Sequence, residues 1–202
     1  MMRHVSIVSL LVLLTACGSS PKTDFYVLSA DHGSMVQAAN SNTGPAVGVW
    51  SVRLPGFLER SEIVSRDGEY EIKLGDFSWW ASNLDENMTQ LIANELSQRL
   101  QSNRVVVSPW PSFHEIDYQT IVRVERFDGV LGGEAVLRGV WSLLDAKGQQ
   151  ELRRQAFEFK AMAAGSSDPV AASYQGLVAA LSRLTVQLAE QMAKVILEQE
   201  SM

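Results

Sequence analysis

The first seventeen residues constrain this chain more than any other segment. Arg3 provides a positive charge, and residues 5–14 form an apolar segment of about ten residues, the length of a signal peptide. Such a segment is too short to cross a bilayer as a helix. Two small residues, Thr15 and Ala16, then precede Cys17, the single cysteine of the chain. This order predicts a lipobox, in which a signal peptidase cuts before Cys17.

Cys17 is therefore expected to carry covalent acyl chains. Each buried CH₂ group contributes about 0.8 kcal/mol, so two or three chains anchor a protein stably on a membrane. The alternative is a buried structural cysteine, but the charge, the length and the small residues all occur in the order of a lipobox. We expect a signal peptide over residues 1–16, a lipidated tether over 17–23 and a single domain over 24–200. Apart from the acyl chains, no cofactor is expected.

Composition limits the partners of this domain. The chain has 23 acidic and 17 basic residues, a formal net charge of −6, and no run of basic residues. Nucleic acid is therefore not expected as a partner. Because lipidation would consume the only cysteine, the domain must be stable without a disulfide. No segment after Cys17 reaches 18 consecutive apolar residues, so we expect the protein to be anchored to a membrane and not to span it.

Hydrophobic periodicity predicts an α+β fold. Apolar residues spaced by three and four predict helices over residues 83–100 and 169–197. The Asp-Gly pair at 67–68 predicts a type I′ hairpin turn between strands 63–66 and 69–72. Further strands are predicted over residues 24–28, 47–52, 105–107, 118–127, 135–144 and 152–162. The expected fold is a largely antiparallel mixed sheet with two long helices packed on one face.

A search for catalytic residues finds no recognisable motif. The chain after Cys17 has two histidines, His32 and His114, and neither lies in a catalytic or metal-ligating pattern. The glycines of residues 129–133 lack the spacing of a phosphate-binding loop and are predicted to form a turn between two strands. We therefore expect neither an enzyme nor a metal site. A cleft that gathers acidic residues near His114 would argue for the opposite.

Two segments offer side chains for binding a partner. Adjacent tryptophans precede the first helix, and two adjacent rings cannot easily face the same side, so one is expected to be exposed. One interpretation is an aromatic anchor at a protein or lipid interface. The alternative for them is a hydrophobic staple onto that helix. Residues 55–60 leave a strand through a Pro-Gly turn, which is either tucked under the sheet or presented as a binding loop. The hypothesised partner-binding residues are Pro55, Phe57, Leu58, Arg60, Trp79 and Trp80.

Four segments behind the lipobox occur in the order typical of one family. They are Phe25-Tyr26-Val27-Leu28, residues 54–60 followed by Ile63-Val64, Trp80 leading into the helix of Leu84, and residues 124–128. With them the chain resembles the PqiC (YmbA-like) family of ABC-type transport auxiliary lipoproteins, the membrane integrity-associated transporter subunits. The Pro-x-x-Leu-acid-Arg stretch is the most specific element. The family usually has tyrosine and aspartate where this chain has Phe57 and Glu59.

The resemblance implies a lipoprotein on the periplasmic face of the outer membrane. It would dock with an MCE-domain protein of the inner membrane in a Pqi-like system that transports lipids and maintains envelope integrity. Gly18 and Ser19 support the outer membrane, because an aspartate beside the cysteine would signal inner-membrane retention in enteric bacteria. Two alternatives are a structural envelope lipoprotein and a carrier that binds a lipid within its fold, which needs a large apolar cavity. A homo-oligomer that matches a multimeric partner is also left open.

Overall fold

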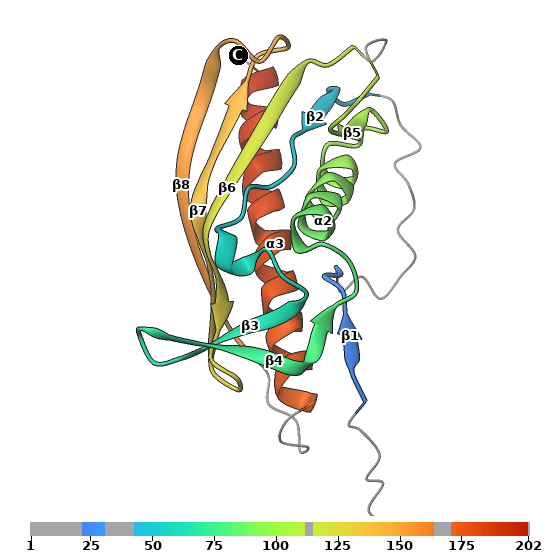
Figure 1. Ribbon diagram of the computed structural model, residues 1–202. Helices are drawn as coiled ribbons and strands as arrows, with labels where there is room; N and C mark the ends of the chain where they lie inside the picture. The colour runs from blue at the N-terminus through green and yellow to red at the C-terminus, as the bar shows by residue number, and fades with distance from the viewer. Residues whose placement is uncertain (1–21, 31–42, 112–114, 164–170, 202) are drawn as a thin grey trace, which may run out of the picture.

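The computed structural model describes residues 22–30, 43–111, 115–163 and 171–201. The predicted signal peptide, Cys17, His32 and His114 lie outside these ranges. Within them the chain forms two helices, a three-stranded sheet and a five-stranded sheet (Figure 1). The predicted fold class, a mixed α+β domain with two long helices, is confirmed, and the strands are divided between two sheets.

The five-stranded sheet combines parallel and antiparallel pairs. Strands β6 (Tyr118–Gly129), β7 (Glu134–Leu144) and β8 (Glu151–Met162) form the predicted antiparallel meander. Strand β2 (Val47–Val49) pairs in parallel with β6 on one side and with β5 (Val105–Val107) on the other. This pairing places the segment that follows β2 alongside β6.

The three-stranded sheet is built on a hairpin. Strands β3 (Glu62–Asp67) and β4 (Glu71–Trp80) pair antiparallel, and β1 (Asp24–Tyr26) pairs in parallel with the end of β4. The parallel register aligns Phe25 with Trp79. Strand β1 lies at the lower end of Figure 1, and the carboxyl end of the last helix lies at the upper end.

The hairpin is confirmed, but its turn differs from the predicted type I′ geometry. Asp67 pairs with Glu71 in the ladder, so the loop has three residues, Gly68, Glu69 and Tyr70. A type I′ turn needs positive φ at both central residues. Gly68 has a φ of +78°, whereas Asp67 remains in β3, where its carboxylate accepts a hydrogen bond from the Lys73 ammonium group.

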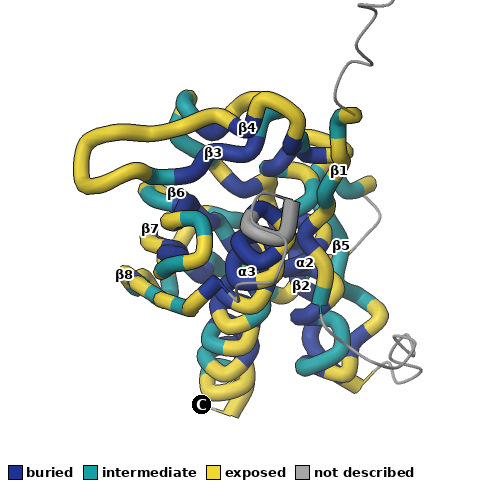
Figure 2. Tube along the Cα trace, turned by 90° about the horizontal axis from the view of Figure 1, so that it is seen from below, coloured by how far each residue is buried: buried dark blue, intermediate teal, exposed yellow. Residues whose placement is uncertain are grey.

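The two helices supply much of the core. Helix α3 (Ala171–Glu200) packs on β6, β7 and β8, and α2 (Leu84–Arg99) packs beside α3 and against β5. Figure 2 shows the buried sides of both helices at the centre of the molecule. Burying one leucine fully contributes about 1.5–3 kcal/mol. The fully buried leucines of α3 are Leu177, Leu181, Leu184 and Leu188.

An ion cluster joins the two sheets. The carboxylate of Asp128 in β6 is fully buried, and Arg66 in β3 donates to both of its oxygens, from Nε at 3.0 Å and from Nη2 at 2.7 Å. Arg126 donates to the same carboxylate from Nε at 2.8 Å. Burial disfavours the charged form, but the two guanidinium groups outweigh it and hold the pKa of Asp128 below its ordinary value. The buried carboxylate of Asp128 thus links the three-stranded sheet to β6, in addition to the packing of β3 against β6.

Candidate partner-binding groove

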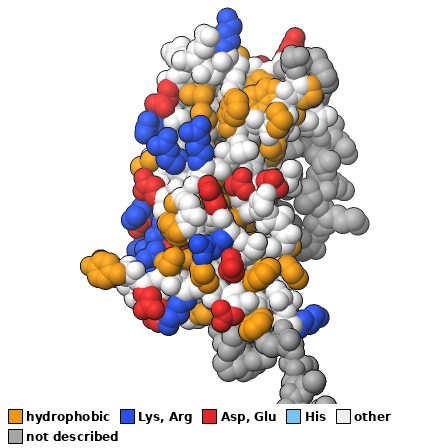
Figure 3. All heavy atoms as spheres, in the orientation of Figure 1, with side chains coloured by type: hydrophobic (Ala, Val, Ile, Leu, Met, Phe, Trp, Pro, Cys, Tyr) orange, Lys and Arg blue, Asp and Glu red, His pale blue; other side chains and the backbone are white. Residues whose placement is uncertain are grey.

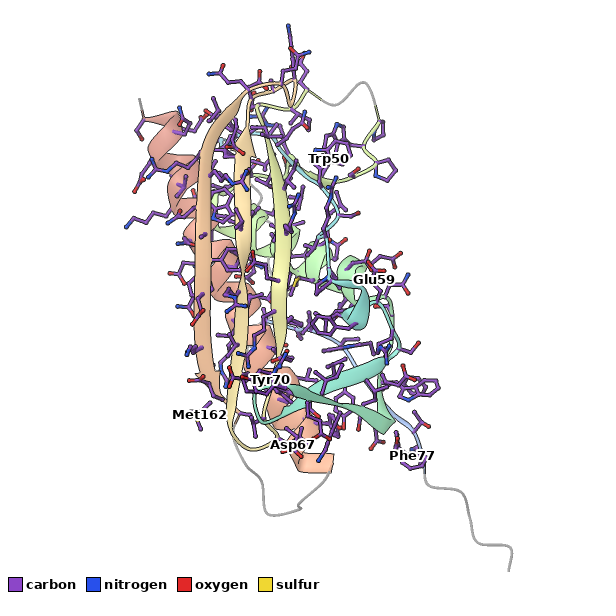
Figure 4. The ribbon with its side chains drawn as sticks, turned by 60° about the vertical axis from the view of Figure 1, so that its left-hand side comes forward. Trp50, Glu59, Asp67, Tyr70, Phe77 and Met162 are labelled. Carbon is purple, nitrogen blue, oxygen red and sulfur yellow. The ribbon has the colours of Figure 1, made fainter. Side chains whose placement is uncertain are left out.

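A groove of about 1070 Å³ lies between the segment after β2, the turn that precedes β3 and the start of α2. Its lining comes from residues 50–54, 58–61 and 80–85, together with Ile121 of β6. Glu59 stands at the side of the molecule, well above the hairpin tip (Figure 4). These segments are far apart in the sequence, so the groove exists only in the folded domain.

Hydrogen bonds fix the wall that follows β2. The backbone N–H of Val52 donates to Oγ1 of Thr89 in α2 at 2.9 Å, and that hydroxyl donates to the carbonyl of Asp85 at 2.6 Å. The next residue, Arg53, is tied to the opposite side, because its N–H donates to the carbonyl of Val122 in β6 at 3.0 Å. This wall is therefore held between α2 and the larger sheet.

The Pro-Gly segment forms a short 3₁₀ turn, Gly56–Leu58, at the floor of the groove. The carbonyl of Pro55 accepts a hydrogen bond from the N–H of Leu58 at 2.8 Å. Leu58 is buried, Phe57 is half-buried against the core, and the next two residues, Glu59 and Arg60, are exposed. The segment therefore has features of both alternatives, a turn packed under the sheet and an exposed binding loop. Its apolar residues pack into the core, and its charged pair faces solvent.

The adjacent tryptophans point to different sides, as their adjacency predicts. Trp80 is buried and lines the groove, and its backbone N–H donates to the carbonyl of Ser61 at 2.7 Å. Trp79 is half-buried and makes an edge contact with the ring of Phe25, with centroids 6.3 Å apart and planes at 87°. Trp80 is thus part of the groove, whereas Trp79 belongs to a surface next to β1.

The groove has an apolar floor and a charged rim. Four buried side chains form the floor: Val52, Leu58, Trp80 and Leu84. Four charged side chains of mixed sign stand around them: Arg53, Glu59, Arg60 and Asp85. Figure 3 shows acidic and basic side chains mixed across the middle of this face. An apolar centre that contains a tryptophan, surrounded by a polar rim that contains arginine, is typical of protein–protein interfaces.

Three of the six hypothesised residues meet in this groove, namely Leu58, Arg60 and Trp80. Pro55, Phe57 and Trp79 do not line it, and Phe57 packs against the hydrophobic core instead. Arg53 and Asp85 also line the groove but were not predicted. Arg53 is positioned by an isolated bridge to Arg123 of β6, a pairing over a long sequence distance. Asp85 lies in the first turn of α2, whose packing in the folded domain brings it to the groove. Cys17, the hypothesised attachment site, lies outside the described residues.

Neither a metal-binding cluster nor a membrane-spanning helix is found in the part of the chain that the structure describes. Within residues 22–30, 43–111, 115–163 and 171–201, no group of three or more His, Cys, Asp and Glu side chains is placed to hold a metal ion. Neither of the helices in these ranges is long and apolar enough to cross a membrane.

The comparisons with known proteins agree on the fold. A family model described as ABC-type transport auxiliary lipoprotein component matches residues 26–193. The crystal structure of an uncharacterised protein superposes with a TM-score of 0.68 at 20% identity, covering 87% of this chain and 99% of that one. Protein XCC0632 from Xanthomonas campestris gives 0.64 at 15% identity, covering 88% and 99%. The comparison with curated proteins gave no match.

Proposed function

Because this chain belongs to the family of ABC-type transport auxiliary lipoprotein components, we propose that it is the docking subunit of an MCE-type intermembrane lipid transport system. The matched residues, 26–193, contain every segment that lines the groove. The description of the family is that of a transport component.

The observation that carries the docking role is the composition of the groove. Trp80, Arg53 and Arg60 are of the residue types that contribute most to binding energy in protein interfaces. A carrier that encloses a lipid would need a hollow lined mostly by apolar groups. The charged side chains around this groove, Glu59 and Asp85 among them, fit a protein surface better than an acyl chain.

The sequence of the tether supports the proposed location of the protein. We place the acyl chains on Cys17 and the domain at the periplasmic face of the outer membrane, since Gly18 and Ser19 follow the cysteine. The six residues from Gly18 to Thr23 reach at most about 20 Å when extended. The MCE-domain protein of the inner membrane would therefore have to span most of the periplasm to reach the groove.

Reversing the charge of Arg60 tests the docking role. Arg60→Glu is expected to weaken binding to the purified MCE-domain protein roughly 5- to 30-fold, because an exposed guanidinium at the rim is replaced by a repelling carboxylate. The measurement is titration calorimetry with the acylated full chain in detergent. The matched control is Lys147→Glu, the same charge change in the exposed β7–β8 turn. Equal affinities for the wild type and Arg60→Glu would contradict the docking role of the groove.

A further inference from the structure

Several of the exposed apolar side chains gather at one end of the molecule, whereas Trp50, which is 43% exposed, lies near the other end (Figure 4). Tyr70 at the hairpin tip is 90% exposed, Met162 at the end of β8 is 64% exposed and Phe77 in β4 is 46% exposed. Figure 4 places all three at the lower end, although they come from different segments. Single exposed apolar residues are ordinary, but a group at one end is the mark of an interaction surface.

The aromatic pair next to β1 extends this end. Phe25 is 63% exposed and its ring leans edge-on against Trp79. The indole Nε1 of Trp79 donates to the carbonyl of Asp76 at 3.3 Å, so its polar group is occupied by the protein's own backbone. A tryptophan whose indole N–H is hydrogen-bonded and whose ring is partly exposed is typical of the boundary between water and lipid.

The start of the described chain lies at the same end. Strand β1 begins at Asp24 at the lower end of Figure 1, next to β4. If Cys17 is acylated, the six intervening residues hold this end within about 20 Å of the bilayer. The opposite end of the domain, where α3 finishes, is separated from the tether by the length of a 30-residue helix, about 45 Å. The exposed aromatic residues are thus on the part of the domain that the tether keeps near lipid.

The charged residues at the lower end of the domain indicate which lipid headgroups this surface can contact. The hairpin from Glu62 to Trp80 carries five acidic residues against two basic ones, Arg66 and Lys73. Arg183, which donates from Nη2 to the carbonyl of Met162 at 2.9 Å, adds a third basic residue, so the acidic charges still outnumber the basic ones. An acidic surface is repelled by anionic headgroups, so apolar contact must supply the attraction. A zwitterionic surface is therefore the matching one.

We propose that this end of the domain, formed by Phe25, Tyr70, Phe77, Trp79 and Met162, is a membrane-contact surface that rests on a zwitterionic lipid bilayer. The inference rests on the lipid anchor of the proposed function and adds an orientation to it. The groove, whose rim residue Glu59 stands at the side of the molecule, then stays clear of the lipid and open to a partner.

Single-cysteine labelling tests this orientation. Cys17 is the only cysteine and its sulfur is blocked by acylation, so Phe77→Cys and Met162→Cys each introduce one reactive thiol. Both positions are exposed, and so is the control, Lys147→Cys in the β7–β8 turn at the other end. Each acylated protein carries an environment-sensitive fluorophore and is bound to phosphatidylcholine vesicles. Circular dichroism checks that each labelled variant is folded.

The expected result is a blue-shifted emission from positions 77 and 162 when vesicles are added, together with quenching by nitroxide-bearing lipids. The label at position 147 is expected to show neither change. Vesicle flotation separates the two parts of the account. Protein that does not float overturns the anchor and this inference with it. Protein that floats while the labels at 77 and 162 stay in water overturns the membrane-contact surface alone. A blue shift without vesicles would assign the surface to a second copy of the chain and would also overturn it.

Discussion

Asp128→Ala is expected to lower the free energy of unfolding by about 3 kcal/mol at pH 7. The carboxylate is fully buried and accepts hydrogen bonds from Arg66 and Arg126, so its removal leaves two guanidinium groups without their anion. The value is at the low end for a broken buried pair, because both arginines keep partial contact with solvent. Urea unfolding followed by circular dichroism measures it.

The control for this prediction lies on the same strand. Glu125→Ala removes an exposed carboxylate that is 3.4 Å from Arg138, and exposed pairs contribute about 0–1 kcal/mol. We therefore expect Glu125→Ala to unfold close to the wild type. If Asp128→Ala is no less stable than Glu125→Ala, the cluster does not fasten the two sheets together.

The same carboxylate predicts a dependence on pH. The folded-state pKa of Asp128 lies below its ordinary value, so its contribution to stability is fully present above the unfolded pKa of about 3.9. The contribution is lost as the pH falls through the folded pKa. The difference in stability between the wild type and Asp128→Asn should therefore be largest near pH 7 and should shrink in acid below about pH 4. A difference that grows in acid would contradict this assignment.

Cys17→Ser is expected to move the protein from the membrane fraction to the soluble periplasmic fraction. Serine lacks the thiolate that accepts the diacylglyceryl group, and without acyl chains the main source of membrane affinity is gone. Fractionation and metabolic labelling with a radioactive fatty acid measure both effects. Ser20→Ala, which changes the tether but not the lipobox, should stay on the membrane. A Cys17→Ser protein that remains tightly bound to the outer membrane would contradict the anchor.

Local patterns predicted most of the elements of the fold. The spacing of Met88, Leu91, Ile92 and Leu96 predicted α2, and the structure buries all four side chains. The alternation in β7 placed Trp141 in the core, where it is 1% exposed. These predictions succeed because the period of a buried face is a property of neighbouring residues alone.

The division into two sheets could not be predicted in the same way. Strand β1 pairs in parallel with the end of β4, more than fifty positions later, and β2 pairs in parallel with β5 and β6. Packing across the whole domain decides which strands pair in parallel. Hydrophobic periodicity within one strand does not indicate its partner. The type I′ turn was wrong for a related reason, since cross-strand contacts of Asp67 keep it in the ladder.

Three of the six hypothesised residues, Leu58, Arg60 and Trp80, line the candidate groove. They were chosen because a loop that follows a Pro-Gly turn can present a binding surface and because two adjacent tryptophan rings cannot easily face the same side. Arg53 carries no such signal, and it becomes a rim residue only because its backbone is hydrogen-bonded to Val122 of β6. The sequence pattern accounts for Asp85 as an acidic residue in the first turn of α2. It gives no sign that the same side chain also lines the groove.

Photocrosslinking in cells from position 59 tests the central claim most directly. A photoreactive amino acid in place of Glu59 stands at the exposed rim of the groove, and one in place of Lys147 is the control at the upper end of the domain. The account predicts that the MCE-domain protein, identified by its own antibody, is captured from position 59 and not from position 147. Equal capture from both positions, or capture of lipid alone from position 59, would contradict it.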